Sequence, residues 1–250
     1  MALTIAISGK GGSGKTTLAA MIIRLLRGQS HGAILAVDAD PNACLAAMLG
    51  VEPATSIADI REKVVEKTPT NSGMDRVRSF EYGIQQAITE ANGFDLLTMG
   101  RPEGPGCYCA ANNMLRTFLD KLRPQYQYVI IDNEAGMEHL SRRTTNNVDL
   151  LCIVAEPTAI GALTTRRIFE LAKQLPISVK EIGVIWNRAD SSKKGDEIET
   201  FGYIPNDESI FKASIQGKTV FDLEENSAAL SAVRKILETK LNQSQANNKL

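Results

Sequence analysis

The stretch that decides the fold of this chain is Gly9-Lys10-Gly11-Gly12-Ser13-Gly14-Lys15-Thr16-Thr17. It satisfies the pattern G-x-x-x-x-G-K-[ST], in which glycines let backbone N–H groups wrap phosphates, the lysine reaches the outer phosphates and the hydroxyl holds Mg²⁺. A β-prone run precedes it at 3–8 and a helix-forming run follows at 18–26, so we expect a strand-to-helix turn with the helix N-terminus facing the anion. The stretch predicts a site for ATP or ADP with Mg²⁺, and the predicted nucleotide-binding residues are Gly11, Gly12, Ser13, Gly14, Lys15, Thr16 and Thr17.

Apolar strand-like segments recur along the rest of the chain, with helical stretches between them. They lie at 33–37, 94–99, 128–131, 150–154 and 181–186. This alternation predicts an α/β fold with a mostly parallel central sheet and helices on both faces. Ligands bind such sheets at the carboxyl ends of the strands, so functional residues are expected there.

Length and composition favour one domain that spans 1–250. A chain of 250 residues, 43% hydrophobic and 23% charged, is long enough for one sizeable core. The stretch at about 51–93 is rich in charge and turn residues, and we interpret it as an insertion with a loop at 68–73 and a helix at 74–91. The polar end at about 242–250 has no apolar face and is expected to fray.

Charge and hydropathy argue against several kinds of partner. The net charge of −1 gives no support for nonspecific nucleic-acid binding, which requires many lysine and arginine contacts on one face. No apolar run reaches the roughly 18 residues that a membrane span needs, and the chain enters its first strand without a signal-peptide pattern. We therefore expect a cytoplasmic protein with no nucleic-acid and no membrane partner.

Two carboxylates, Asp38 and Asp40, follow the strand expected at 33–37, and Pro41 limits Asp40 to extended geometry. An acidic residue there can orient a water molecule for in-line attack on the γ-phosphate, so Asp40 is a predicted catalytic residue. The alternative is that one of the two caps a helix that starts just after them.

A third carboxylate, Asp132, ends the strand at 128–131 and lies four residues before Gly136. This is the usual arrangement of a carboxylate that contacts Mg²⁺ through water and of a sensor-loop glycine whose N–H detects the γ-phosphate. The predicted magnesium residues are Thr16, Asp38 and Asp132.

A cysteine pair, Cys107 and Cys109, follows a glycine- and proline-rich turn and precedes a helical run at 112–122. A helix N-terminus lowers the pKa of a thiol toward the thiolate, the metal-binding form. Two thiolates cannot complete a four-coordinate shell, but a twofold dimer would supply four and close one site across its interface. Four thiolates suit Zn²⁺ in a tetrahedron and Ni²⁺ in a square plane. A regulatory disulfide and an inert pair are the other interpretations.

The remaining thiols and one histidine give weaker signals. Cys44 and Cys152 lie in apolar stretches and are interpreted as small packed hydrophobic residues. His139 lies just beyond the predicted sensor glycine, and a hydrogen-bonded helix residue is a commoner explanation for it than metal transfer.

Lys10 is a second lysine directly after the first glycine, and it makes the loop resemble the deviant Walker A loop of the MinD/ParA/nitrogenase-iron-protein class. The resemblance implies a homodimer in which Lys10 crosses the interface to the partner's nucleotide and acts in catalysis beside Lys15. Asn187 and Pro205 are similar to the base-recognition positions of that class, although an ordinary strand-end asparagine fits the spacing nearly as well.

The chain as a whole resembles the CooC-type nickel-insertion ATPases that mature carbon monoxide dehydrogenase, and their relatives that serve acetyl-CoA synthase. The resemblance rests on residues 9–17, 38–45, 107–109 and 135–140. It implies ATP hydrolysis, a nickel site formed by the paired cysteines across a nucleotide- and metal-promoted dimer, and a client nickel enzyme. An iron–sulfur scaffold ATPase and a metal-free, nucleotide-switched regulator remain as alternatives.

Overall fold

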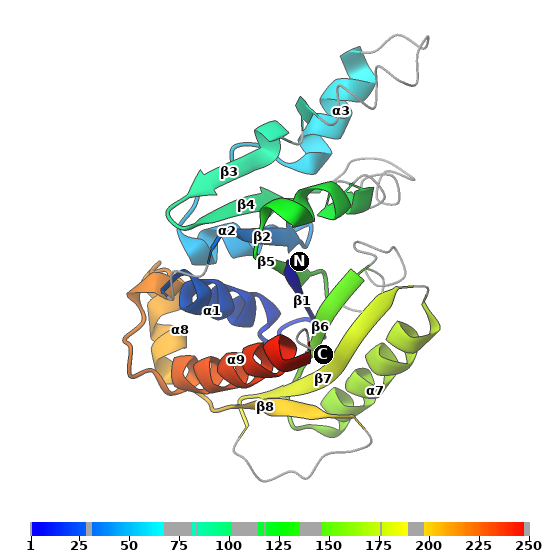
Figure 1. The fold of residues 1–250 in the computed structure, drawn as a ribbon. Helices are drawn as coiled ribbons and strands as arrows, with labels where there is room; N and C mark the ends of the chain where they lie inside the picture. The colour runs from blue at the N-terminus through cyan, green and yellow to red at the C-terminus, as the bar shows by residue number, and fades with distance from the viewer. Residues whose placement is uncertain are drawn as a thin grey trace.

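The computed structural model describes residues 2–28, 32–67, 82–83, 85–101, 115–117, 119–135, 147–175, 177–189 and 198–247. Within these residues, an eight-stranded sheet carries helices on both faces (Figure 1). The strands are β1 (Leu3–Gly9), β2 (Ile34–Ala39), β3 (Ile88–Ala91), β4 (Phe94–Thr98), β5 (Tyr128–Asn133), β6 (Asn147–Ala155), β7 (Ser178–Asn187) and β8 (Thr200–Ile204). The helices are α1 (Lys15–Gly28), α2 (Cys44–Leu49), α3 (Ile57–Lys67), α7 (Ala159–Gln174), α8 (Glu208–Ile215) and α9 (Ala228–Asn247), with 3₁₀ turns η1 (Arg123–Gln125) and η2 (Val220–Asp222). No helix of the described segments is both long and apolar enough to cross a bilayer.

The sheet confirms the predicted mostly parallel α/β fold. Its strand order is β3-β4-β2-β5-β1-β6-β7-β8, and neighbouring strands run parallel except β3 and β4. β1 lies in the middle, between β5 and β6. The loop that follows β1 therefore opens at the centre of the carboxyl edge of the sheet, where such folds bind ligands.

Alternate residues of each central strand point to opposite faces of the sheet. One face packs against α1 and α9, and the other packs against α7 (Figure 1). Because both faces are covered, the strands read as continuous apolar runs rather than as alternating patterns. Residues on the α1 face include Ile5, Ala36, Leu96 and Ile130, and those on the α7 face include Ala6, Val37, Leu97 and Ile131.

The stretch at about 51–93 leaves the sheet through α3 and returns to it as an edge strand. The helix expected at 74–91 is wrong for its last four residues, which form β3 and pair antiparallel with β4. The two strands are joined by Asn92 and Gly93, and Gly93 has a left-handed φ of 87°. A two-residue Asn-Gly connection strongly favours a hairpin, and it outweighs the helical tendency of the preceding residues.

Two features at the end of the chain also differ from expectation. β8 has no strong apolar run and is not predicted from the sequence, yet it pairs with β7. The expected fraying at 242–250 is wrong for 242–247, because α9 continues to Asn247. This stretch contains no glycine or proline, and Lys240 just before it is anchored by Glu181 at 3.0 Å and Glu199 at 2.7 Å, so the helix propagates from a fixed turn.

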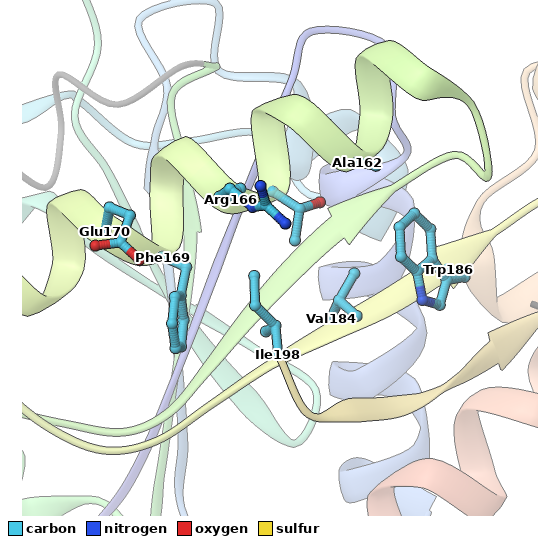
Figure 2. Close-up of a pocket in the computed structure, with 8 residues that line it drawn as sticks. Ala162, Arg166, Phe169, Glu170, Val184, Trp186 and Ile198 are labelled. Atoms are coloured by element: carbon cyan, nitrogen blue, oxygen red, sulfur yellow. The ribbon is translucent and has the colours of Figure 1, made fainter. Parts of the chain in front are cut away.

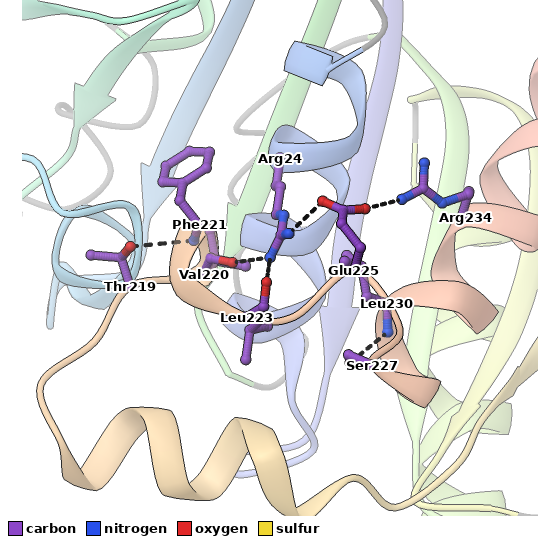
Figure 3. A network of polar contacts seen from close by, with 9 residues as sticks. All are labelled: Arg24, Thr219, Val220, Phe221, Leu223, Glu225, Ser227, Leu230 and Arg234. Atoms are coloured by element: carbon purple, nitrogen blue, oxygen red, sulfur yellow. Dashed lines mark hydrogen bonds and ion pairs between the residues drawn. The ribbon is translucent and has the colours of Figure 1, made fainter.

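Arg24 on α1 fixes the segment that leads into α9 (Figure 3). Its guanidinium donates to the carbonyls of Val220 at 2.7 Å and Leu223 at 2.8 Å, and it pairs with Glu225 at 2.7 Å. Glu225 also pairs with Arg234 of α9 at 2.8 Å. The helix that follows the phosphate loop is thus tied to α9 through η2.

Asp207 joins α8 to α9. Its carboxylate caps α8 by accepting from the Ser209 N–H at 2.9 Å, and it also accepts from the Ser227 hydroxyl at 2.7 Å and the Ala229 N–H at 3.1 Å. Burial acts to raise the pKa of Asp207, but these hydrogen bonds together outweigh burial and lower the pKa to about 2.

We expect Asp207→Ala to lower the free energy of unfolding by about 2 kcal/mol at neutral pH, because it removes a helix cap and the bonds to α9. A carboxylate whose folded-state pKa is lowered stabilises the fold above its ordinary pKa, and this contribution is lost as the pH falls toward about 2. Urea unfolding should therefore show the deficit of the variant shrinking below about pH 4. The control is Glu208→Ala, which removes an exposed pair with Lys212 and should cost about 0.5 kcal/mol or less. Equal losses in both variants would contradict this role of Asp207.

Candidate functional site

The phosphate-binding loop connects β1 to α1 in a tight, glycine-dependent conformation. Gly12, with φ 76°, and Gly14, with φ 98°, lie in the left-handed region that favours glycine. The N–H of Ser13 donates to the carbonyl of Lys10 at 3.2 Å, which closes the turn. The loop ends at the N-terminus of α1, so its backbone N–H groups and the helix dipole are both available to an anion.

The two lysines of the loop lie in different surroundings. Lys15 is 6% exposed, and its ammonium donates to the carbonyl of Lys10 at 3.4 Å. Burial lowers the pKa of Lys15, while Asp132, Asp40 and Glu134 act in the opposite direction. The side chain of Lys10 is exposed. Lys15 is therefore held within the loop, and Lys10 is accessible to another molecule.

Asp38 and Asp132 lie side by side, because the register of β2 and β5 pairs them. Both are buried, with exposures of 0% and 1%. Burial raises the pKa of Asp38 to about 6 and that of Asp132 to about 7. Asp38 accepts from the N–H of Leu45 at 2.8 Å and of Asp40 at 3.2 Å. Neither oxygen of Asp132 accepts a hydrogen bond of good geometry from the described residues, although the Thr16 hydroxyl is close enough to lower its pKa.

These groups fit a magnesium ion bound with a nucleotide. A buried carboxylate without a partner is costly unless a cation neutralises it, and Mg²⁺ typically takes one or two carboxylates together with phosphate oxygens. Thr16, at the start of α1, acts to lower the pKa of Asp132, as expected for a hydroxyl close to that carboxylate. The fold thus brings together Thr16, Asp38 and Asp132, and their role as magnesium residues stays a prediction.

Asp40 lies half-buried at the rim of the site. Its carboxylate accepts from the backbone N–H and the side-chain amide of Asn42, both at 2.9 Å. The carboxylate of Asp38 instead accepts a hydrogen bond from the N–H of Leu45, in the first turn of α2. The capping alternative therefore applies to Asp38 and not to Asp40. Asp40 is close enough to affect the pKa of Lys15, and its catalytic role stays a prediction.

Asn187 is the last residue of β7, and Pro205 comes directly after β8. The register of the two strands pairs Asn187 with Ile204, so Asn187 and Pro205 lie at the same end of the sheet. The amide of Asn187 donates to the carbonyl of Ser13 at 2.8 Å, and its oxygen accepts from the N–H of Arg188 at 3.0 Å. A side chain at Gly14 would collide with this amide. Asn187 thus ties β7 to the phosphate loop, and base recognition by Asn187 and Pro205 stays a prediction.

Sequence reasoning did not identify Glu156 and Arg188, which form an ion pair beside the loop. Arg188 also reaches the carbonyl of Gly12 at 3.5 Å. With Lys10, Glu156 lines a groove of about 70 Å³ along the loop. Both residues follow strand ends, those of β6 and β7, and that position is the signal that could have identified them.

Four positions singled out in the sequence lie outside the described residues, namely Cys107, Cys109, Gly136 and His139. Across the segments that the structure describes, no group of three or more histidine, cysteine, aspartate or glutamate side chains is arranged to hold a metal ion. The proposed metal site therefore depends on the sequence pattern of the cysteine pair.

The other two cysteines differ from each other. Cys152 is buried, and burial raises the pKa of its thiol to about 12, as expected for a packed hydrophobic residue. Cys44 is exposed, so its interpretation as a packed residue is wrong. It stands at the first position of α2, where the inner face of the helix is taken by Leu45 and Ala46.

Two further pockets differ in position, since one lies away from the phosphate loop and the other includes Thr17 at the end of the loop. The one between α7 and β7, lined by residues that include Phe169, Val184 and Trp186, measures only about 10 Å³ (Figure 2). That is about the space of one water molecule, so it is a packing gap. A pocket of about 230 Å³ between α2 and α8 includes Thr17, whose hydroxyl donates to the sulfur of Met48 at 3.9 Å.

The fold and the site define a P-loop nucleotide-binding protein, and comparison with known proteins identifies its family. Residues 4–220 match the family described as the CobQ/CobB/MinD/ParA nucleotide binding domain. The chain is 38% identical to an uncharacterized ATP-binding protein of Methanocaldococcus jannaschii, over 96% of this chain and 99% of that protein. It is 34% identical to the carbon monoxide dehydrogenase accessory protein CooC of Rhodospirillum rubrum, over 88% of this chain and 90% of that one.

A solved structure has the same fold. The septum site-determining protein MinD of Pyrococcus horikoshii, complexed with Mg-ADP, superimposes with a TM-score of 0.69 at 21% identity, over 96% of each chain. The match over residues 4–220 shows that the protein belongs to the CobQ/CobB/MinD/ParA family. It is an ATPase of the MinD/ParA class.

Proposed function

We propose that this ATPase is a metallochaperone that binds nickel at a site shared across a homodimer and inserts it into carbon monoxide dehydrogenase or acetyl-CoA synthase. The observation that carries the proposal is the pair Cys107 and Cys109 in a chain that is similar to a carbon monoxide dehydrogenase accessory protein over 88% of its length. Nickel is the cargo in this proposal, and each protomer supplies two of the four thiolates that hold it.

The segment that leads to the cysteine pair starts beside the nucleotide site. The N–H of Met99, at the end of β4, donates to the carbonyl of Asp38 at 2.8 Å, and Cys107 follows eight residues later. A displacement of Asp38 on nucleotide binding would reach this segment through one backbone hydrogen bond. Nucleotide can drive nickel release only if the two nucleotide states bind nickel with different affinity, and this connection offers a route for that difference.

Hydrolysis in this proposal uses the chain's own charges. Mg²⁺, held by Thr16, Asp38 and Asp132, would neutralise charge on the phosphates. Lys15 stabilises negative charge on the outer phosphates from within the loop, and Asp40 orients the attacking water. The exposed Lys10 reaches the nucleotide of the second protomer, so turnover requires the dimer.

The client surface in this proposal includes the stretch at about 51–93 and the helical run predicted at 112–122, after Cys109. Loops on a shared scaffold usually carry partner choice. The stretch is anchored by the pairing of β3 with β4 and by Ile57 and Ile60, which are buried against the α7 face of the sheet, so partner choice would rest on its exposed residues.

The cysteine pair also supports a second candidate, an iron–sulfur carrier, because four thiolates are the usual ligands of such clusters. The third candidate is a nucleotide-switched regulator without a metal. Metal and sulfide analysis of the reduced dimer separates the three. Nickel without sulfide supports nickel insertion, iron with sulfide supports the carrier, and no bound metal supports the regulator.

The decisive assay incubates a nickel-free client enzyme with this protein, Ni²⁺ and either ATP or a non-hydrolysable analogue. We expect activation of the client with ATP and little with the analogue, and we expect Cys107→Ser to abolish it. Cys44→Ser, which alters an exposed thiol outside the pair, is the matched control and should activate normally. Equal activation by ATP, by the analogue and by Cys107→Ser would remove the insertion hypothesis.

A further inference from the structure

Thr98, the last residue of β4, carries a buried hydroxyl without a partner. The residue is 3% exposed, and its oxygen makes no hydrogen bond with any of the described residues. Buried hydroxyls are nearly always paired, so an unpaired one points to a partner that is absent or to a side chain that moves when a ligand binds.

The sheet places this hydroxyl in line with the proposed magnesium residues. The register of β4 and β2 pairs Thr98 with Asp38, and the register of β2 and β5 pairs Asp38 with Asp132. Paired residues of parallel strands point to the same face of the sheet. The core agrees, because the residues two positions earlier in these strands all pack on the α1 face, namely Leu96, Ala36 and Ile130. Thr98, Asp38 and Asp132 therefore form a row on the α1 face of the sheet.

Asp38 can accept another hydrogen bond. Its carboxylate accepts from the N–H groups of Leu45 and Asp40, whereas an ionised carboxylate has about four acceptor sites. Next to Thr98, the N–H of Met99 donates to the carbonyl of Asp38 at 2.8 Å, which fixes β4 against β2 at this point. A rotation of either side chain, without movement of the backbone, is therefore the simplest way to bring the hydroxyl and the carboxylate into contact.

We propose that Thr98 is a positioning residue, which donates a hydrogen bond to Asp38 when nucleotide and Mg²⁺ bind and thereby orients this carboxylate toward the ion. The inference rests on the magnesium site proposed above. The hydroxyl carries no charge and is buried, so in this proposal it acts on magnesium affinity and not on the binding of the nucleotide itself.

The test compares Thr98→Val, which keeps the branched shape and removes the hydroxyl, with Thr98→Ser, which keeps the hydroxyl. ADP affinity is measured by calorimetry over a series of Mg²⁺ concentrations, without any hydrolysis. In Thr98→Val, the Mg²⁺ concentration that gives half of the gain in ADP affinity should rise about tenfold, the effect of losing one hydrogen bond to a charged group. Its ADP affinity without Mg²⁺ should not change, and Thr98→Ser should stay within about twofold of the original protein.

Asp38→Asn, measured in the same way, separates the role proposed for Thr98 from the proposed magnesium site. If Asp38→Asn loses the response to Mg²⁺ and Thr98→Val keeps it, the role of Thr98 is overturned and the magnesium site stands. If Asp38→Asn responds normally, both are overturned. A shift in Thr98→Ser as large as that in Thr98→Val also overturns the proposal, since serine retains the donor. Should the valine variant fail to fold, Thr98→Ala takes its place, and a normal response to Mg²⁺ in Thr98→Ala overturns the proposal.

Discussion

Replacing Lys10 by alanine should lower ATP turnover by about a thousandfold while ATP binding is kept, because a cation supplied to a transferring phosphate from a second molecule is worth about 10³–10⁵ in rate. The side chain of Lys10 is exposed, and the contact that Lys10 makes with Lys15 uses its backbone carbonyl. The substitution therefore leaves the internal bonds of the loop in place. Single-turnover hydrolysis and an ATP titration on the same preparation measure the two quantities.

Lys15→Ala is the matched comparison. Lys15 is buried among Asp132, Asp40 and Glu134, so its removal leaves these acidic groups without their cation and should weaken ATP binding itself.

Mixing the Lys10→Ala and Lys15→Ala proteins tests directly whether Lys10 acts on the nucleotide of the other protomer. In a mixed dimer, the Lys10→Ala protomer keeps Lys15 and the Lys15→Ala protomer keeps Lys10. One of the two sites therefore has both lysines and is complete. Random mixing should restore about a quarter of the original activity, since half of the dimers are mixed and each has one working site. No recovery on mixing, or undiminished hydrolysis by Lys10→Ala alone, would contradict a lysine that acts across the interface.

Nickel should bind with one ion per two chains and promote dimerisation, and Cys107→Ser or Cys109→Ser should abolish both effects. A site that exists only in the dimer stabilises the dimer by mass action, which amounts to about a hundredfold in the association constant when free nickel is 100 times its Kd. Light scattering with and without Ni²⁺ or Zn²⁺, on reduced protein, gives the association, and metal analysis gives the stoichiometry.

Cys44→Ser controls for thiol loss in general, because it removes an exposed thiol that belongs to no pair. It should bind nickel and dimerise as the original protein does. A stoichiometry of one ion per chain, or binding that survives both substitutions in the pair, would exclude the shared site.

The parts of the fold that the sequence predicts are those with strong local signals. The strands at the centre of the sheet are continuous apolar runs, and the phosphate-loop motif predicts the turn between β1 and α1. β8 escapes prediction because its residues are only partly buried, so its pairing with β7 depends on a neighbour distant in sequence. β3 was predictable in principle from Asn92 and Gly93, but the charged residues before them favour a helix.

The site was predictable where a motif or a strand end marks it. Lys15, Asp38 and Asp132 were found this way, and the fold brings them together. Thr98 and Arg188 were missed although they also stand at strand ends, because that position alone does not say that they lie beside Asp38 and the phosphate loop. Their positions follow from strand order and register, which arise from packing across the whole sheet.

The central position of β1 has a consequence for how the protein is made. β1 leaves the ribosome before the other strands of this sheet, yet its neighbours are β5, which begins at Tyr128, and β6. At synthesis rates of about 5–20 residues per second, the first strand waits roughly 6 to 25 s for its nearest partner. During that interval its apolar residues and those of α1 are exposed in the nascent chain, where a chaperone can bind them. Nucleotide cannot assist folding before more than half of the chain has emerged, because the phosphate loop acquires its supporting strand only then.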